Sequence, residues 1–559
     1  MTQRIFIGVA WPYANGPLHL GHIAGAAIAP DIFARYHRLK GNEVLMVSGS
    51  DQHGTPITLR AEQEGKTPKE VAEHYHKSFV DSMAKMGISF DLFTSTGTKN
   101  HKEVAQDIFL TLLKKDYIYK DVQSLPYCER CKRFLPDRYV EGTCPHCGFE
   151  NSRGDQCDEC GKPLNAGELK SIRCSICGST PQFIESEHYF LRLSVFNDKL
   201  LEWVKQKNHF RKNAQNFTLR LLKEGLHDRA ITRDIEWGIP VPVSGFENKR
   251  LYVWFEAVIG YLSASKEWAK LSGNAEKWRD FWTGDCKSYY FAGKDNIPFH
   301  TIIWPAMLMG YGDLNLPYDV PANEYLTLEG RQFSTSRNWA VWLPYYLEKY
   351  PPDPLRYLLS INMPETNDAD FSWREYVRRN NDELVATYGN LVHRVLTFTY
   401  RNYDGRVPEH GHYNEMSQAL LAESAKTLDA VGGMLGRCQF RAAIRKIMAL
   451  AQKANQYLDE SAPWKKIKED RALAADILNV VIEVICCLKT VLYPFLPFSS
   501  QKLHAMLGFD DNLDDYGWTI SRPPVGQELL KPDPLFAKLD EDVVKEETEI
   551  LLAEQKETG

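Results

Sequence analysis

Two features are missing from the sequence: a run of apolar residues long enough to cross a membrane, and a segment that resembles an export signal. Net positive charge is missing as well, because 67 Lys and Arg residues stand against 73 Asp and Glu residues. We therefore expect a cytoplasmic protein without a membrane partner. A nucleic acid would have to be held by local basic patches rather than by overall charge.

The 559 residues are 43% hydrophobic and 12% aromatic, which is enough for three or four folded domains. Near the N-terminus, a strand pattern at 4–11, a helix pattern at 21–40 and a strand pattern at 44–47 follow one another. This order predicts an α/β fold with a Rossmann-type parallel sheet. An amphipathic helix is expected at 67–86. From 380 to 510 the apolar spacing is helical, which predicts an α-helical bundle.

Eight of the 12 cysteines form four C-x2-C pairs. Without an export signal this spacing indicates metal binding before disulfides, because two thiolates three residues apart can bind one face of a tetrahedral ion. Eight ligands predict two structural Zn2+ sites within an insertion. Four pairs can combine in three ways, and spacing alone leaves all three open. The pairs are Cys128/Cys131, Cys144/Cys147, Cys157/Cys160 and Cys174/Cys177.

Two histidines, His19 and His22, flank Gly21 where the first strand gives way to a helix. Free backbone N–H groups and the positive helix end favour an anion there, and imidazole donors can stabilise charge in phosphoryl or adenylyl transfer. Histidines at such a spacing also fit ordinary surface or core positions. The preceding run Pro-Tyr-Ala-Asn-Gly-Pro, residues 12–17, and the strand-to-helix setting favour a nucleotide site.

With these flanks, residues 19–22 resemble the HIGH motif of the class I aminoacyl-tRNA synthetases, which activate an amino acid with ATP and transfer it to tRNA. The resemblance implies that His19 and His22 are catalytic and that Gly21 and His22 bind ATP. It also implies Mg2+ as the ion that accompanies the ATP.

The second motif of that family, KMSKS, falls on residues 332–336, where Gln332 and Thr335 replace its two lysines. In the family these lysines neutralise the ATP phosphates. Either Arg331 or Arg337 supplies the charge in a variant loop, or adenylation is weakened. The loop residues that the resemblance makes catalytic are Arg331, Gln332, Ser334, Thr335 and Ser336, of which Thr335 would also contact ATP.

Three further blocks, residues 47–56, 252–261 and 293–306, are similar in order and spacing to blocks of the methionyl-tRNA synthetases. The resemblance implies a pocket in which aromatic rings surround a thioether, and a phenol or imidazole hydrogen bond to its sulfur would disfavour aliphatic competitors. Taken singly, each aromatic residue also fits core packing, and Val258 replaces a proline common in the family. The residues placed around the side chain are Trp11, Tyr13, Trp254, Ala257, Tyr261, His300 and Trp304.

The same resemblance assigns the polar contacts. Asp51 would pair with the substrate ammonium, Arg233 would face the carboxylate or the phosphates, and Asp295 would bind the ribose hydroxyls. A surface ion pair is the alternative for Arg233. The resemblance also groups the cysteines, with an inner site of Cys144, Cys147, Cys157 and Cys160 and an outer site of Cys128, Cys131, Cys174 and Cys177. Because the insertion is largely committed to metal, we expect no separate editing domain.

The helical C-terminal region resembles the anticodon-binding bundle of the family. Asn390 and Arg394 lie one turn apart, and Trp464 follows Pro463. An amide, a guanidinium and an indole can hydrogen-bond to unpaired bases and stack on them. On spacing alone, Trp464 fits the bundle core. No oligonucleotide-binding domain follows, so we expect a monomer unless another chain supplies a dimerisation module.

These inferences predict a methionine–tRNA ligase with L-methionine, ATP and tRNA(Met) as partners. The alternatives are a catalytically weakened tRNA-binding paralogue, a class I synthetase for cysteine or isoleucine, and a small-molecule nucleotidylyltransferase. The expected domains are a first catalytic half (1–117), the zinc-knuckle insertion (118–229), a second catalytic half (230–325), the KMSKS-type and stem-contact region (326–379), the anticodon-binding bundle (380–510) and a C-terminal extension (511–559).

Overall fold

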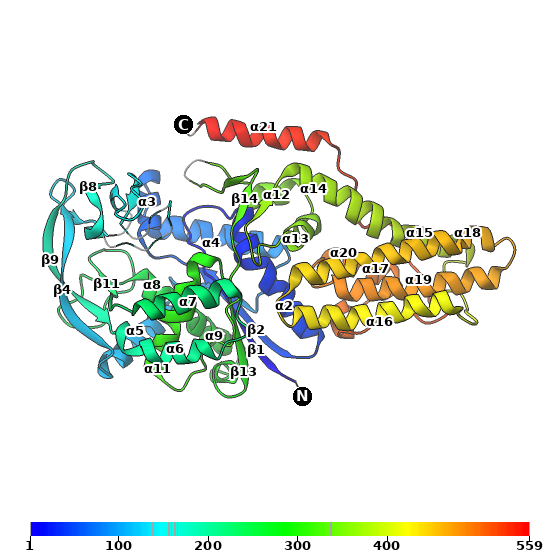
Figure 1. The fold of residues 1–559 in the computed structure, drawn as a ribbon, viewed down its shortest axis with the longest axis horizontal. Coiled ribbons are helices and arrows are strands. Elements are labelled where there is room, and N and C mark those ends of the chain that lie inside the picture. Colours follow the sequence, from blue (N-terminus) through cyan, green and yellow to red (C-terminus); the bar gives the residue numbers. More distant parts are fainter. Residues whose placement is uncertain are drawn as a thin grey trace.

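The computed structural model describes residues 2–136, 139–154, 157, 159–160, 162, 164, 166–335 and 338–557. Sheets occupy one end of the molecule and long helices the other (Figure 1). None of the described helices is long and apolar enough to span a membrane.

A parallel sheet lies at the centre of the first half, with the strand order β13-β1-β2-β3. Its strands are β1 (Arg4–Val9), β2 (Glu43–Ser50), β3 (Leu92–Ser95) and β13 (Cys286–Phe291). Alternate side chains of β1 enter different cores: Ile5 and Ile7 pack with α2 (Ile28–Leu39) and α4 (Pro68–Lys85), whereas Phe6 packs with α5 (Lys99–Lys114) and α9 (Gly260–Leu271). Helices therefore cover both faces, as a parallel sheet requires, and the expected Rossmann-type fold is confirmed.

The helix expected at 21–40 is interrupted by a π-helical turn. It consists of α1 (Leu20–His22), the π turn η1 (Ile23–Ala27) and α2, and Gly41 follows it with a φ of 76°. A π turn adds a residue to the helix and often marks a functional site. The helix expected at 67–86 is α4, whose N-cap Thr67 forms a capping box with Glu70. Between β2 and α4 lies α3 (Thr55–Glu64).

The insertion is built on a long antiparallel ribbon of β4 (Ile118–Cys128) and β9 (Gln182–Leu191), seen at one end of Figure 1. Short strands extend the ribbon or form a small sheet beyond it: β5 (Arg133–Phe134), β10 (Arg229–Ala230), β6 (Val140–Thr143), β7 (Ser152–Arg153) and β8 (Lys170–Cys174). Two helices, α6 (Asn197–Lys205) and α7 (Lys212–Glu224), lead back towards the parallel sheet.

Residues 230–379 complete the sheet end of the molecule. The elements before residue 320 are β11 (Thr232–Arg233), β12 (Arg250–Leu251), α8 (Val253–Glu256), α10 (Arg279–Trp282) and α11 (Trp304–Tyr311). Those after it are β14 (Leu326–Leu328), β15 (Arg331–Gln332), α12 (Leu343–Lys349), α13 (Pro352–Ile361), β16 (Ala369–Phe371) and α14 (Trp373–Arg379).

A helical bundle forms the other end, as expected. Its helices are α15 (Asn390–Asn402), α16 (Glu415–Leu435), α17 (Phe440–Ser461), α18 (Pro463–Lys466), α19 (Arg471–Leu492) and α20 (Pro497–Met506). The buried guanidinium of Arg356 joins the two ends, because it bonds the Asp31 carboxylate at 2.6 Å and the Phe495 carbonyl at 2.7 Å. The C-terminal helix α21 (Asp542–Glu557) runs back over α12 and α14 (Figure 1), where buried Glu547 accepts hydrogen bonds from Tyr345 and Tyr350.

Candidate functional site

The two histidines of the first motif hold each other in place. His19 is the N-cap of α1, and its Nδ1 accepts the Gly21 N–H at 3.1 Å, while the Nδ1 of His22 accepts the His19 N–H at 3.1 Å. Their rings stack 3.8 Å apart. Desolvation lowers the pKa of His22 to about 4, and desolvation together with His22 lowers the pKa of His19 well below its usual value. Both rings are therefore neutral, with the proton on Nε2, and present two N–H donors at a helix start.

The loop that corresponds to the second motif covers these histidines. Phe333 stacks on His19, with ring centroids 4.8 Å apart and planes only 10° from parallel. Ser334 exchanges backbone hydrogen bonds with Trp339, whose ring also lies under the Arg331 guanidinium at 4.9 Å. Phe333 was not among the residues predicted to act, although it lies inside the motif.

The lysine-free positions of this loop, Gln332 and Thr335, are both exposed. Arg331, which directly precedes Gln332, is also exposed, and among the described residues of the loop it is the one with a positive charge. Ser336 and Arg337, which also belonged to the predicted loop, lie outside the described residues.

A cavity of about 280 Å3 opens at the carboxyl ends of β1 and β2. Asp51 forms its acidic end, and its Oδ1 accepts bonds from the His53 N–H at 3.2 Å and the Thr96 hydroxyl at 3.4 Å. Burial and the nearby Glu256 carboxylate raise the pKa of Asp51 well above its usual value. A buried carboxylate of this kind gains much from a cationic partner. Eight of the predicted residues line the cavity: Trp11, Tyr13, Asp51, Trp254, Ala257, Tyr261, Asp295 and His300.

The Trp11 indole is held between two glycines. A Cβ at Gly49 would lie 2.2 Å from the Trp11 ring, and one at Gly260 would lie 2.7 Å from it. Both distances are too short for any side chain, so glycine at these positions lets the indole lie against the sheet and form a wall of the cavity.

At the apolar end, the Tyr261 hydroxyl and the His300 Nε2 are 2.7 Å apart, and the His300 Nδ1 lies 2.8 Å from the Asn296 carbonyl. A carbonyl only accepts, so Nδ1 carries the ring proton and Nε2 accepts from Tyr261; burial also lowers the pKa of His300 to about 4. Neither proton can then be donated to a sulfur atom. The expected hydrogen bond to a thioether would require Tyr261 or His300 to exchange this partner and stays a prediction, while packing against the rings contributes to the recognition.

Trp304 is not among the described residues that line this cavity. Its fully buried indole donates from Nε1 to the Tyr290 hydroxyl at 3.1 Å, so it supports the wall from behind. The resemblance placed it near the pocket without fixing which way the ring points.

Arg233 lies just outside the cavity, where its guanidinium stacks on the Tyr252 ring at 3.6 Å and bonds the Ala230 carbonyl at 3.0 Å. It lines a second cavity, of about 480 Å3, which shares the walls Tyr252, Trp254 and Phe299 with the first. At the boundary of two cavities, the Arg233 guanidinium can contact a bound ligand. This position favours a binding role over the surface ion pair that was the alternative for Arg233.

Asp295 also borders the first cavity. It follows β13 in a short helical turn, and its Oδ1 accepts the Tyr325 hydroxyl at 2.5 Å. This bond fixes the direction of the carboxylate, while Lys294 beside it pairs with Glu324 at 2.9 Å and Asp368 at 3.0 Å.

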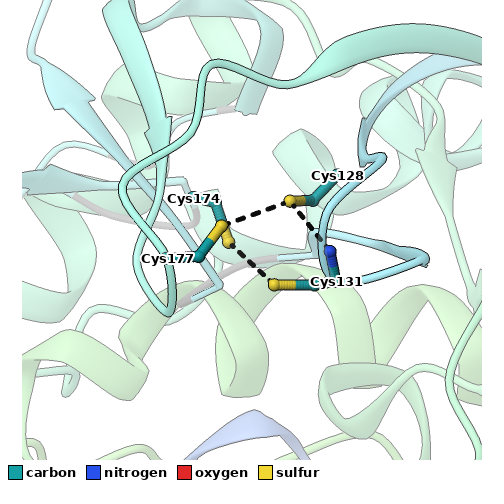
Figure 2. Close-up of side chains that lie close together, drawn as sticks. All are labelled: Cys128, Cys131, Cys174 and Cys177. Atoms are coloured by element: carbon teal, nitrogen blue, oxygen red, sulfur yellow. Dashed lines mark hydrogen bonds between the residues drawn. The ribbon is translucent and has the colours of Figure 1, made fainter.

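The eight paired cysteines come together as two groups of four, with all ligand sulfurs of a group within 4.8 Å of one another. One group, shown in Figure 2, holds Cys128, Cys131, Cys174 and Cys177. The other holds Cys144, Cys147, Cys157 and Cys160. Gly148 and Gly178, which follow two of the pairs, have φ values of 80° and 72°, which favour glycine. Gly161, after a third pair, lies outside the described residues.

The sulfur spacing of both groups fits a metal ion. Neighbouring sulfurs are 3.5 and 3.9 Å apart in the first group, and 3.6 and 3.9 Å apart in the second. A tetrahedral ion with metal–sulfur bonds of about 2.3 Å separates its ligands by about 3.8 Å. Each group could therefore hold one ion with all four positions filled by sulfur, and the grouping is the one that the resemblance implied.

Two family models match this chain. Residues 5–396 match the model "tRNA synthetases class I (M)", and residues 407–554 match the anticodon binding domain of methionyl tRNA ligase. The methionine–tRNA ligase of Dehalococcoides mccartyi strain CBDB1 is 63% identical over 98% of this chain and 99% of its own length. This chain belongs to the methionyl-tRNA synthetase family.

Two further members of the family are similar to this chain over nearly its whole length, one in sequence and one in structure. The methionine–tRNA ligase of Thermomicrobium roseum is 52% identical, with both chains fully covered. Among solved structures, the methionyl-tRNA synthetase of Mycobacterium tuberculosis in complex with methionyl-adenylate superposes with a TM-score of 0.81 at 27% identity, over 96% of this chain and 100% of that one.

The bundle carries a cavity of about 270 Å3 at the place where members of this family have their anticodon-binding domain. Arg394 and Trp464 both line it, and the guanidinium lies over the indole ring at 4.9 Å while bonding the Asp459 carboxylate at 3.1 Å. Trp464 is thus half-exposed rather than a core residue. Asn390 is exposed one turn before Arg394 on α15. Sequence reasoning did not single out His393 and Arg401, which line the same cavity.

Proposed function

We propose that the chain is a methionine–tRNA ligase. It activates L-methionine with ATP to methionyl-adenylate, releasing pyrophosphate, and then transfers the methionyl group to the 3′ end of tRNA(Met). The observation that carries this proposal is the buried Asp51 carboxylate at the acidic end of a cavity lined by aromatic rings. The M. tuberculosis relative, solved with methionyl-adenylate, supports the same reaction.

In this proposal, Asp51 binds the ammonium group of methionine. The rings of Trp11, Tyr13, Trp254 and Tyr261, with His300 and Ala257, enclose the thioether. This arrangement selects a long, flexible and polarizable side chain by contact area, because the hydrogen-bond donors at the apolar end are already satisfied.

The ATP would lie between the histidines and the second-motif loop. The Nε2–H groups of His19 and His22 donate to phosphate oxygens as negative charge develops, Gly21 allows the nucleotide to approach, and Asp295 accepts from the ribose hydroxyls. Mg2+ would accompany the phosphates. Arg233 would bind the carboxylate or phosphate oxygens from the edge of the second cavity.

The loop residues Arg331, Gln332, Ser334, Thr335 and Ser336 would close over the phosphates, with Thr335 in contact with ATP. Since Gln332 and Thr335 are uncharged, we propose that arginine supplies the charge that lysine supplies elsewhere. The exposed Arg331 guanidinium, which stacks on the Trp339 ring, is the residue we propose for this role.

The amino acid on which adenylation depends tests the proposal. Purified protein incubated with labelled pyrophosphate and ATP should exchange label into ATP when L-methionine is added. L-isoleucine and L-cysteine should support less than about 1% of that rate, because a branched or short side chain leaves the aromatic cavity poorly filled. Exchange with a different amino acid only would overturn the assignment, and no exchange with any, despite tRNA binding, would favour a weakened paralogue.

We propose that both cysteine groups hold Zn2+, since an all-thiolate tetrahedral donor set is the usual environment of structural zinc. The ions would tie the ends of the insertion together and take no part in the reaction, because no ligand position is left open.

Metal analysis of the purified protein should therefore give two zinc ions per chain. Cys147→Ser should lower the content to one and lower the melting temperature, because a site with three thiolates binds zinc more weakly. The matched control is Cys286→Ser, which removes a partly buried thiol outside both groups and should keep two ions. A wild-type protein with one ion or none would contradict the proposal.

At the far end, Arg394, Trp464 and Asn390 would read the anticodon of tRNA(Met) by stacking and hydrogen bonding. We further propose that the chain acts as a cytoplasmic monomer, unless a second chain supplies a dimerisation module.

A further inference from the structure

Behind the acidic end of the methionine cavity lies a fully buried carboxylate, Glu256, between two imidazoles. Its Oε1 is 2.7 Å from the His53 Nδ1, and its Oε2 is 2.5 Å from the His101 Nε2. Glu256 ends α8, His101 lies in α5, and His53 follows two residues after Asp51. None of the three lines the cavity, and the function proposed above does not use them.

The contacts of Ser263 bear on the charge of His101. The Ser263 hydroxyl lies 3.1 Å from the Gly260 carbonyl and 2.8 Å from the His101 Nδ1, and when its proton goes to the carbonyl, its oxygen accepts from that Nδ1. Burial raises the pKa of Glu256, but the two histidines that bond it lower the value to about 2. The carboxylate is therefore ionised and only accepts hydrogen bonds. In that arrangement His101 donates from both ring nitrogens, which only an imidazolium can do. His53 has to supply only one proton to Glu256, from its Nδ1.

This charge matters because two carboxylates are buried close together. The Glu256 charge contributes to the raised pKa of Asp51. If nothing balanced Glu256, the pair would share a proton, and Asp51 would be neutral when the ammonium group arrived. With His101 charged, Glu256 and His101 cancel, and Asp51 keeps the only net charge of the cluster.

We infer that His101 and Glu256 form a built-in ion pair that keeps Asp51 ionised for the substrate ammonium, so that His101 is a positioning residue for amino-acid recognition. The inference rests on the proposed function. It adds a residue, His101, that does not contact the substrate itself. Its action is electrostatic, because the net charge of Asp51, Glu256 and His101 is −1 before the ammonium binds and zero afterwards.

Three variants separate this role from a packing role. His101→Gln keeps an N–H near the position of Nε2 but removes the charge, so the KM for methionine in pyrophosphate exchange should rise about 10-fold or more. Glu256→Gln should change it by less than about threefold, because His101 can then release a proton and leave Asp51 as the only charge. The double variant, which lacks both charges, should also return to within about threefold of wild type.

Two competitive ligands locate the effect. L-methioninol keeps the ammonium group and lacks the carboxylate, whereas 4-(methylthio)butanoate keeps the carboxylate and lacks the ammonium group. In His101→Gln, the dissociation constant of methioninol, measured by calorimetry, should rise by the same factor as the KM. That of 4-(methylthio)butanoate should not rise.

The outcomes are distinct. If the cluster were only packing, Glu256→Gln would be as harmful as His101→Gln, and the double variant would be the worst of the three; this result would overturn the inference. So would a His101→Gln protein that binds both ligands as wild type does. If the wild type showed no methionine-dependent exchange, the proposed function would fail, while the calorimetric comparison would still decide the charge of His101.

Discussion

Replacing Asp51 by asparagine should raise the KM for methionine by about 100-fold or more. The two residues have the same shape, so the asparagine of the variant can still accept the His53 N–H through its amide oxygen. The substitution removes the charge alone, and an ammonium group buried without its counter-ion costs about 3 kcal/mol or more, which is about 100-fold in affinity. Pyrophosphate exchange at varied methionine concentration measures the effect.

The KM for ATP is the internal control for this variant. Asp295 and the two histidines hold the nucleotide from other elements, so the ATP value should stay within about threefold of wild type. Thr96→Val provides a structural control, since it removes the hydroxyl that donates to the same carboxylate at 3.4 Å and accepts the Gln52 N–H at 2.9 Å, without removing charge. A methionine KM in Asp51→Asn no higher than in Thr96→Val would mean that Asp51 does not bind the ammonium group.

The fold followed closely from local patterns. The amphipathic pattern at 67–86 predicts α4 to within a residue, and the strand–helix–strand order predicts the parallel sheet. The π turn at Ile23–Ala27 was not predicted, because it depends on tertiary contacts such as the Asn323 amide on the Ala24 carbonyl at 2.9 Å. The helical spacing of apolar residues cannot predict a hydrogen bond to Asn323, which lies 299 residues away in the chain.

The sequence predicted most of the residues that line the site, but it did not predict how their side chains are oriented. The resemblance brought most of the lining residues together, yet it could not tell that Trp304 turns away from the cavity to bond Tyr290. Nor could it give the proton positions of His300, which depend on the Asn296 carbonyl and the Tyr261 hydroxyl at once. Phe333 and His101 were missed for the same reason, since their contacts join segments that are far apart in the chain.

The second large effect is expected at His22. His22→Asn keeps an acceptor close to the position of Nδ1 for the His19 N–H, but removes the Nε2–H that we propose donates to phosphate. Losing one donor that acts on the developing charge costs about 100-fold to 1,000-fold in kcat. The exchange kcat should fall by that factor, while the KM for methionine changes less than about threefold.

His22→Gln is the matched comparison, because its amide nitrogen reaches the position of Nε2 and can still donate. It should keep at least about a tenth of the wild-type kcat, clearly above the asparagine variant. The pH profile adds an independent check. Because the pKa of His22 is lowered to about 4, the ring stays neutral until the pH falls through that value, and the wild-type rate should show no step near pH 6.5 from this group. If asparagine and glutamine reduced kcat equally, the imidazole would act through the shape of the helix start rather than as a donor to phosphate.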